Sequence, residues 1–503
     1  MSTRRRLLAI AAIAIVAFGW WYGQGIVPRL SNHRGYQLIA VDDRVSEAAA
    51  AAYAPVRPRR VFLVLVDGLR ADVAATLGSV QKLRAAGVCR RTHVSLPTVS
   101  RPVYALVSTG VEQDRSGARN NDESSPLAAE SIWQVARAAG RRVAGVSVLT
   151  WWRELWPDGF DRYEKLAPED DLFARAARAD EDLVLVHPAY VDEAGHEHGG
   201  ASRQYHEAAV RADRELGELL AQVDFSRDVV LVTADHGHSD AGGHGGDAPE
   251  VATTLTCYAG PGVVRREGGP LVDMQERSIG PLVAVLAGLR FPRHMRPGLG
   301  DAVWDDLAAG LPAAYVAERR AAEGRFAAAS ASLPQVYRSA RRLQHLRGGA
   351  VLLAAALAFA FVARRRGLDA RASAALAAWL LGVVALHIAV YVVVRGSFDM
   401  TSINQRAGWI RASMLLGVGV GALGLLVHRR VFRTRPRTGL VADQLTLAML
   451  GVAGAAAHAA AYGWVFGFPL PGAYLLFFPF FAAAYIIAHG VVALLAAAWP
   501  RGD

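Results

Sequence analysis

The sequence predicts an α/β domain with a mostly parallel central sheet, preceded by one membrane-spanning helix and followed by five more. Short apolar runs such as VFLVLV, at 61–66, and VVLVTA, at 229–234, have the composition of buried strands. Helical patterns lie between these runs, so that strand and helix alternate along the chain, as they do in α/β folds. Long apolar stretches near both ends of the 503 residues predict the membrane helices.

The first membrane helix is predicted at the N-terminus. An RRR triplet precedes the apolar stretch Leu7–Val27, which is long enough to cross a bilayer. A WWY triplet at 20–22 is typical of a membrane interface, and the segment lacks a convincing small-x-small cleavage site. We therefore expect residues 1–29 to form an uncleaved signal anchor, with a cleaved signal peptide as the alternative. A polar, Ala-rich connector is expected at 30–59.

The predicted α/β domain occupies residues 60–300, and a helical connector, 301–347, follows it. Strand patterns alternate with helical patterns such as ADVAATLGSVQKLRAAG and SIWQVARAAG, which indicates parallel strands joined by helices. In such a sheet, ligands bind beyond the carboxyl ends of the strands. Three apolar runs are followed there by an aspartate: Asp67, Asp192 and Asp235.

Five apolar segments within residues 348–499 predict a multi-span membrane region, because several approach or exceed the ~20 residues that cross a bilayer. Basic clusters at 364–366 and 428–437 lie between them. Since cytoplasmic loops carry an excess of Lys and Arg, this pattern predicts that the α/β domain lies outside the cytoplasm. A bundle of buried soluble helices is the alternative. The five segments are Gly348–Ala363, Ser373–Val394, Ala412–Val427, Ala442–Phe466 and Ala473–Trp499.

The basic charge of the chain, +10 in formal terms, does not indicate a nucleic-acid partner. The acidic residues fall mostly before residue 335, whereas basic clusters flank the apolar segments and have the placement of membrane flanks. The chain has only two cysteines, Cys89 and Cys257, too few for a disulfide scaffold. The sequence leaves open whether they pair.

Aspartates and histidines gather directly after three of the predicted strands. Carboxylate and imidazole side chains delivered from strand ends are the ligands of a site for two zinc-like ions. Between the first two of these motifs, SLPTVSRP offers hydroxyls just ahead of a predicted helix. The motifs VDGLRAD, VDEAGHEHG and TADHGHSDAGGHGG contribute Asp67, Asp192, His196, Asp235, His236 and His244.

This ordered set of motifs resembles the alkaline phosphatase superfamily, over about residues 60–265. Within it, the chain is most similar to the enzymes that add ethanolamine phosphate to GPI anchors, with nucleotide pyrophosphatase/phosphodiesterases as near relatives. The resemblance implies an alkaline-phosphatase-like sandwich and two divalent metal ions, for which zinc is the expected metal. By the same resemblance, one ion is held by Asp192, His196 and His244, and the other by Asp67, Asp235, His236 and the oxygen of the nucleophile.

The resemblance also indicates the nucleophile and a phosphate-binding residue. The position of the attacking hydroxyl falls on Ser100 of VSRP, and Thr98 is the competing candidate. A bound ion lowers the pKa of such a hydroxyl enough for attack. Asn121, 21 residues further on, matches a phosphate-binding asparagine of the phosphodiesterases. The adjacent Asn120 is a second candidate, and an ordinary turn is an equal alternative for this Asn-Asn pair.

Three further histidines lie near these motifs. His187 ends a predicted strand and is a candidate to hold a metal-binding carboxylate in place. His198 and His238 stand beside ligand positions and are candidates to contact substrate. Because histidines hydrogen-bond in many structural settings, we expect these two to be neighbours fixed by packing.

We therefore expect a membrane-anchored phosphotransferase that acts through a covalent intermediate on Ser100 or Thr98. By resemblance, it moves a phosphoethanolamine-type group from a lipid phosphodiester to a glycan or lipid hydroxyl. One alternative is a phosphodiesterase or nucleotide pyrophosphatase, in which water replaces the acceptor. Another is a catalytically silent membrane scaffold. The expected location is the bacterial inner membrane, with the catalytic domain facing the periplasm.

Overall fold

The structure is a computed structural model that describes residues 3–26, 38–122, 124–266, 268, 270–365, 367, 369–404, 406–431, 437–463 and 473–498. The chain divides into two compact units: an α/β unit, Asn32–Val336, and a helical unit, Met1–Ser31 with Tyr337–Asp503. The first part of the expected connector, residues 30–37, and residues 432–436 of the basic cluster lie outside the described residues.

The α/β unit is built on an eight-stranded sheet with the order β4-β3-β5-β1-β6-β7-β2-β8. The strand pairs are parallel except for those of β7, which runs antiparallel to both β6 and β2. The expected fold class, an α/β sandwich with a mostly parallel sheet, is therefore confirmed. The strands are β1 (Arg60–Leu65), β2 (Val88–His93), β3 (Val143–Ser147), β4 (Arg162–Lys165), β5 (Leu183–His187), β6 (Asp228–Thr233), β7 (Thr253–Ala259) and β8 (Val272–Gln275).

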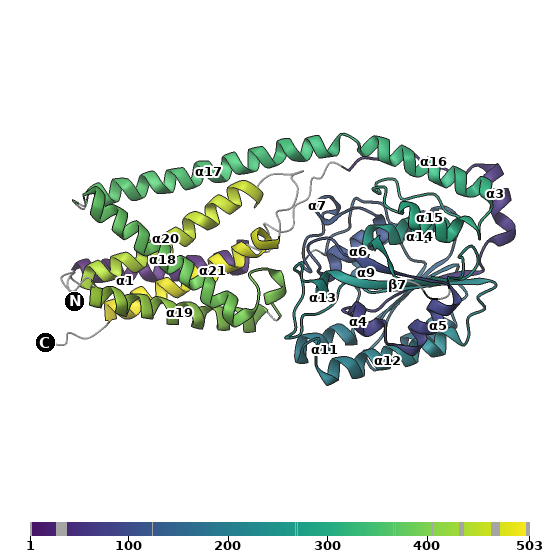
Figure 1. The fold of residues 1–503 in the computed structure, drawn as a ribbon, viewed down its shortest axis with the longest axis horizontal. Helices are drawn as coiled ribbons and strands as arrows, with labels where there is room; N and C mark the ends of the chain where they lie inside the picture. The colour runs from purple at the N-terminus through teal and green to yellow at the C-terminus, as the bar shows by residue number, and fades with distance from the viewer. Residues whose placement is uncertain are drawn as a thin grey trace. The chain divides into compact units, whose positions relative to one another are not determined.

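Helices cover both faces of the sheet (Figure 1), and this explains why its central strands are apolar throughout. Alternate residues of β1 enter two separate cores: Val61 and Leu63 contribute to one, Phe62 and Val64 to the other. The first face carries α6 (Ser100–Thr109), α8 (Ile132–Ala138), α9 (Trp151–Leu155) and α14 (Ile279–Leu286). The second carries α4 (Ala71–Ala74), α5 (Gly78–Ala86), α10 (Leu172–Ala177), α11 (Tyr190–His198) and α12 (Arg203–Leu220). The short helices α7 (Gln113–Ser116) and α13 (Pro249–Ala252) lie in connections.

The segments on either side of the expected α/β domain pack against it. Helices α15 (Gly300–Ala308) and α16 (Ala313–Ser330) add Trp304, Tyr315 and Phe326 to the first core. Helix α3 (Glu47–Tyr53) belongs to the same layer, because Tyr53 joins this core. The buried carboxylate of Asp43 pairs with Arg319 of α16 at 2.8 Å, which ties residues before the sheet to residues after it.

Cys89 and Cys257 form a disulfide. They are direct neighbours in the register of antiparallel strands β2 and β7, and both are buried. The sequence left this pairing open because the two residues are 168 positions apart. The sheet topology decides it.

The helical unit contains long apolar helices: α1 (Thr3–Trp21), α17 (Leu333–Arg365), α18 (Ala370–Arg395), α19 (Arg406–Val431), α20 (Arg437–His458) and α21 (Ala473–Ala498). Six stretches of the described residues are long and apolar enough to cross a membrane, one near the N-terminus and five in the C-terminal part. One of them, Ala313–Arg365, includes α16, which packs in the α/β unit, so its apolar window lies in α17. The N-terminal and C-terminal apolar helices expected from the sequence are thus present.

Candidate active site

The three strands that precede the Asp and His motifs are neighbours in the sheet. β5, β1 and β6 are adjacent and parallel, so their carboxyl ends meet at one edge. Asp67 follows β1, Asp192 lies in the first turn of α11 after β5, and Asp235 follows β6. The topology therefore brings all three carboxylates to the edge where α/β sheets bind ligands.

Asp67, Asp235 and His236 form a buried group, here called the inner group, whose ligand-type atoms lie within 4.8 Å of one another. His236 Nε2 is 3.2 Å from Asp235 Oδ2 and 3.6 Å from Asp67 Oδ1. Neither of these carboxylate oxygens accepts a hydrogen bond from the described residues, although both are buried. Two acceptor oxygens without donors, beside an imidazole nitrogen, fit a divalent cation.

The other oxygen of Asp235 is fixed by the backbone. Asp235 Oδ1 accepts hydrogen bonds from the N–H groups of Gly68 and His236, both at 3.0 Å. Gly68 has a φ of +74°, and a Cβ atom there would lie 2.8 Å from the Cα of Asp192. Only glycine lets this turn contact both aspartates.

The other oxygen of Asp67 is held by a buried network. Asp67 Oδ2 accepts a hydrogen bond from the Tyr104 hydroxyl and lies 3.1 Å from His187 Nε2. The Tyr104 hydroxyl and His187 Nε2 are 2.9 Å apart, and Ser147 Oγ is 2.9 Å from His187 Nδ1. The Tyr104 ring stacks on Trp152 with centroids 4.3 Å apart. The network therefore orients Asp67 so that Oδ1 faces the inner group.

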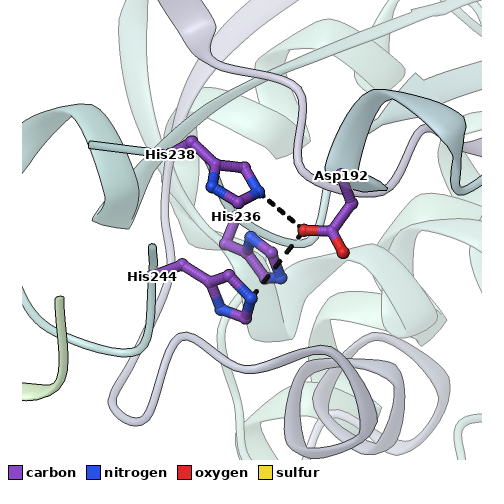
Figure 2. Close-up of side chains that lie close together, drawn as sticks. All are labelled: Asp192, His236, His238 and His244. Atoms are coloured by element: carbon purple, nitrogen blue, oxygen red, sulfur yellow. Dashed lines mark hydrogen bonds and ion pairs between the residues drawn. The ribbon is translucent and has the colours of Figure 1, made fainter. Parts of the chain in front are cut away.

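Asp192, His196, His238 and His244 form a second group, here called the outer group, because Asp192 and His196 are partly exposed. Asp192 Oδ2 is 3.4 Å from His196 Nε2, which is 3.2 Å from His244 Nε2. Asp192 Oδ1 is 2.7 Å from His238 Nε2 and 3.7 Å from His244 Nε2, and Figure 2 shows both rings turned toward this carboxylate. The outer group therefore gathers three imidazole nitrogens around one carboxylate.

The two groups adjoin. The rings of His236 and His244 stack with centroids 3.8 Å apart and planes inclined by 14°. Four ligand-type side chains, Asp192, His236, His238 and His244, also fall within 4.8 Å of one another. The arrangement can therefore present two neighbouring cations to one phosphate.

Burial sets the protonation of these groups in the metal-free protein. Burial opposes ionisation of Asp67, but hydrogen bonds from His187 and Tyr104 and the neighbouring His236 together hold its pKa below the usual value. Burial and the charge of Asp67 raise the pKa of Asp235 well above its usual value. A bound cation would favour the ionised form of Asp235.

Burial favours the neutral form of three histidines of the site. Burial lowers the pKa values of His236 and His244, and it lowers that of His238 to about 3. Neutral imidazole is the form that binds metal ions. The protein therefore keeps these side chains ready for a cation at neutral pH.

The structure separates the two candidate nucleophiles. Ser100 is the first residue of α6, and its Oγ lies 3.4 Å from His236 Nε2, beside the inner group. The Thr98 hydroxyl donates to the carbonyl of Gly246 at 2.7 Å and accepts from the N–H of Gly245 at 3.0 Å. Thr98 is thus engaged in holding the loop that carries His244, whereas Ser100 faces the candidate metal site.

Asn121 lies beside Ser100. Its side-chain carbonyl accepts a hydrogen bond from the N–H of Arg101 at 3.0 Å, so its amide NH2 is the part that can donate to a phosphate. Asn120 instead accepts from the N–H of Asp122 at 2.8 Å, which is an ordinary turn contact. The two interpretations of the Asn-Asn pair therefore apply to different residues.

Arg101, the residue after Ser100 in α6, is held by an aromatic ring and a carboxylate. Its guanidinium lies over the Trp151 ring, 4.5 Å from the centroid, and pairs with Glu154 at 2.6 Å. Arg101 is buried. The guanidinium therefore covers one face of the Trp151 ring.

The sequence reasoning missed Tyr104. A signal was present, because Tyr104 lies four residues after Ser100 and so shares its face of α6. Of the other histidines, His187 lies behind Asp67 as expected, His238 belongs to the outer group, and His198 is exposed.

Residues 61–346 match the model of the family described as type I phosphodiesterase / nucleotide pyrophosphatase. One curated relative, the catalytic subunit of GPI ethanolamine phosphate transferase 3 from Mus musculus, is 29% identical over 283 residues, which are 48% of this chain and 25% of that protein. GPI ethanolamine phosphate transferase 1 from Mus musculus is 22% identical over 302 residues, 48% of this chain and 32% of that protein. The chain thus spans about a quarter to a third of the length of these relatives.

Among solved structures, murine ectonucleotide pyrophosphatase / phosphodiesterase 5 aligns with a TM-score of 0.40 and 14% sequence identity. The alignment covers 46% of this chain and 95% of that chain.

Proposed function

The chain belongs to the type I phosphodiesterase / nucleotide pyrophosphatase family of the alkaline phosphatase superfamily, and on this premise we propose that it is a membrane-anchored, metal-dependent phosphotransferase. It moves a phosphoethanolamine-type group from a lipid phosphodiester to a hydroxyl of a glycan or another lipid. The observation that carries this proposal is the placement of Ser100 beside the inner group, which has two carboxylate oxygens without partners among the described residues and adjoins the outer group. The relatives named as GPI ethanolamine phosphate transferases support the choice of the transferred group.

Two metal ions complete the site in this proposal. Both ligand sets contain carboxylate oxygen and imidazole nitrogen, the ligands that suit zinc. When bound, the ions neutralise the phosphate, lower the pKa of the attacking hydroxyl and stabilise the leaving alkoxide. Asp192, His196 and His244 would hold one ion, and Asp67, Asp235, His236 and the Ser100 oxygen the other.

In the first half-reaction, Ser100 attacks the phosphorus of the lipid phosphodiester. The bond from Ser100 Oγ to phosphorus forms, and the serine proton passes to solvent. The bond between phosphorus and the diacylglycerol oxygen breaks, and the lipid alcohol leaves after taking up a proton. The N–H of Ser100, at the start of α6, and the amide NH2 of Asn121 would donate to the phosphate oxygens.

In the second half-reaction, an acceptor hydroxyl attacks the same phosphorus from the position that the lipid alcohol left. The new bond from the acceptor oxygen to phosphorus forms while the bond to Ser100 Oγ breaks. The acceptor loses its proton and Ser100 regains one, so the enzyme returns to its starting state.

Two features support action at a membrane, outside the cytoplasm. The apolar helices would keep the α/β unit at a bilayer surface, where a lipid substrate is found by diffusion in two dimensions. The disulfide between Cys89 and Cys257 suits an oxidising compartment, such as the periplasm, rather than the cytoplasm.

The test is mass spectrometry of the peptide that contains Thr98 and Ser100. The purified full-length protein, supplied with zinc, is exposed briefly to phosphatidylethanolamine and quenched in acid. We expect a phosphoethanolamine adduct on Ser100, absent from S100A and present in T98V. An adduct on Thr98 would keep the reaction and reassign the nucleophile.

The same preparation discriminates the rival functions. Cleavage of nucleotide diesters by the zinc-loaded protein, without an adduct from phosphatidylethanolamine, would favour the pyrophosphatase alternative of this family. Zinc binding without turnover of any phosphodiester would favour a silent membrane scaffold.

A further inference from the structure

Four histidines of the site, His187, His236, His238 and His244, are buried, and each makes contacts through both ring nitrogens. A neutral imidazole has one N–H donor and one nitrogen with a lone pair. A metal ion needs the lone pair, whereas a carboxylate oxygen can only accept an N–H. The partner of Nδ1 therefore determines whether Nε2 can bind a metal or can only donate.

In His236 and His244, Nδ1 faces a backbone carbonyl. His236 Nδ1 is 3.1 Å from the carbonyl oxygen of Gly237, and His244 Nδ1 is 2.9 Å from that of Thr98. A carbonyl oxygen accepts, so each Nδ1 carries the hydrogen and each Nε2 has the lone pair. Both Nε2 atoms point toward carboxylates, as metal ligands do.

His238 has the opposite arrangement. The N–H of Gly243 donates to His238 Nδ1 at 3.2 Å, so this nitrogen supplies the lone pair. Nε2 therefore carries the hydrogen, and it donates to Asp192 Oδ1 at 2.7 Å. Although His238 lies among the ligand-type side chains of the outer group (Figure 2), its accessible nitrogen is a donor.

The surroundings of His238 are built to hold this ring. Its side chain is fully buried, and it packs against α11 at Gly195. A Cβ atom at position 195 would lie 2.5 Å from the His238 ring. Gly195 lies between Asp192 and His196 in the sequence. Because glycine has no side chain, the His238 ring can contact α11 at this position.

His187 repeats the arrangement behind the other aspartate. Its Nε2 lies 3.1 Å from Asp67 Oδ2, a carboxylate oxygen that can only accept, so this nitrogen carries the hydrogen. Its Nδ1 is then the acceptor for Ser147 Oγ at 2.9 Å, and Ser147 Oγ in turn accepts from the N–H of Leu149 at 3.0 Å. Each aspartate thus has one oxygen fixed by a histidine N–H.

We propose that His238 and His187 are matched positioning residues, one for the aspartate of each metal ion, and that His238 is not a metal ligand. This inference rests on the two-metal site of the proposed function. By holding Asp192 Oδ1, His238 leaves Oδ2 directed toward His196 Nε2 at 3.4 Å. By holding Asp67 Oδ2, His187 leaves the unpartnered Oδ1 directed toward His236.

The experiment measures how many zinc ions the full-length protein binds, and how tightly, by elemental analysis and by titration against a competing chelator. The variants are H238L, which removes the donor, H238Q, which keeps an N–H near the position of Nε2, and H244L, which removes a ligand. We expect H238L to bind two ions at saturation, with one affinity weakened roughly 10- to 100-fold. H238Q should restore most of that affinity, whereas H244L should bind one ion fewer. H187L and H187Q should behave toward the other ion as H238L and H238Q do.

The possible results distinguish a failure of this inference from a failure of the proposed function. A wild-type protein that binds fewer than two ions would overturn the proposed function and this inference together. Two ions in the wild type but one in H238L would make His238 a ligand and overturn the inference alone. Unchanged affinities in H238L or in H187L would also overturn it, because a positioning residue must affect the affinity.

Discussion

The Nε2 atoms of His196 and His244 lie 3.2 Å apart, although the two residues are 48 positions apart in the chain. Two nitrogen ligands of one tetrahedral zinc ion are separated by about 3.3 Å when each bond is about 2.0–2.1 Å. Asp192 Oδ2 lies 3.4 Å from the first of these nitrogens. The outer group therefore has the spacing of a coordination shell.

Replacement of Asp235 should separate activity from stability. We expect D235A to lose more than about 100-fold of its metal-dependent activity, because the inner group loses a ligand that orients both the ion and Ser100. In the presence of chelator the same variant should remain folded with a loss of about 1–3 kcal/mol in stability, because the N–H groups of Gly68 and His236 lose their acceptor, Asp235 Oδ1. Turnover and chelated melting temperature would be measured on the same samples. Activity near that of the wild type would rule out the inner group as a metal site.

Zinc binding should release protons. Burial and the charge of Asp67 raise the pKa of Asp235, so the metal-free protein keeps a proton there that a cation would displace. Calorimetric titration in buffers of different ionisation enthalpy measures the number released. We expect release near neutral pH and a zinc affinity that increases with pH. Binding with no proton release would show that Asp235 is already ionised in the metal-free protein.

The Tyr104 hydroxyl should contribute to metal affinity. Y104F removes a donor to Asp67 Oδ2 but retains the ring that stacks on Trp152, so we expect a roughly 10- to 100-fold weaker affinity for one ion with the fold retained. Y315F is a matched control, because Tyr315 is equally buried and donates to the carbonyl of Val285 in the core at 2.9 Å. Both variants lose a buried hydroxyl, and only Y104F should change zinc affinity.

The chelated protein should lose stability on acidification below pH 6.5. His238 has a folded-state pKa lowered to about 3, and burial also lowers the pKa values of His236 and His244. Below the unfolded pKa of about 6.5, the unfolded chain binds protons that the folded chain excludes, so stability falls by up to about 1.4 kcal/mol per pH unit for each such histidine.

Denaturant unfolding between pH 5 and pH 8 with chelator present tests this pH dependence. The change of stability with pH should be smaller in H238Q, because this variant lacks one of the histidines that exclude a proton. Above pH 7 these histidines should contribute almost no change of stability with pH. A stability that does not change between pH 5 and pH 7 would contradict the prediction.

Glu276 should destabilise the protein at alkaline pH. This carboxyl group is fully buried, and burial raises its pKa well above 4.5. Above the unfolded pKa the unfolded chain releases the proton while the folded chain keeps it, so stability is lost as pH rises toward the folded pKa. E276Q keeps the shape and removes the titration, so it should be more stable than the wild type by about 1–3 kcal/mol at pH 8 and equal to it near pH 4. Equal stabilities at both pH values would show that Glu276 is ionised without cost.

Much of the fold could be predicted because its signals are local. The runs VFLVLV and VVLVTA are apolar at every position, which marks strands covered on both faces, and they became the adjacent strands β1 and β6. The long apolar stretches predicted the helices of the helical unit for a similar reason. The mean hydropathy of ~20 consecutive residues depends only on those residues and not on the rest of the chain. The family resemblance seen in the ordered motifs is confirmed by the match over residues 61–346.

The sequence by itself determined which chemistry is available: Asp67, Asp192 and Asp235 follow strands, and histidines stand within a few residues of the last two. Only the tertiary structure decided how those side chains are used. The pairing of β2 with β7 brings Cys89 and Cys257 together as a disulfide. The backbone N–H of Gly243 donates to His238 Nδ1, and this contact makes His238 a donor rather than a ligand. The physical reason is that residue type and periodicity are read along the chain, whereas a hydrogen-bond partner, a tautomer and an unpartnered oxygen depend on contacts between residues far apart in it.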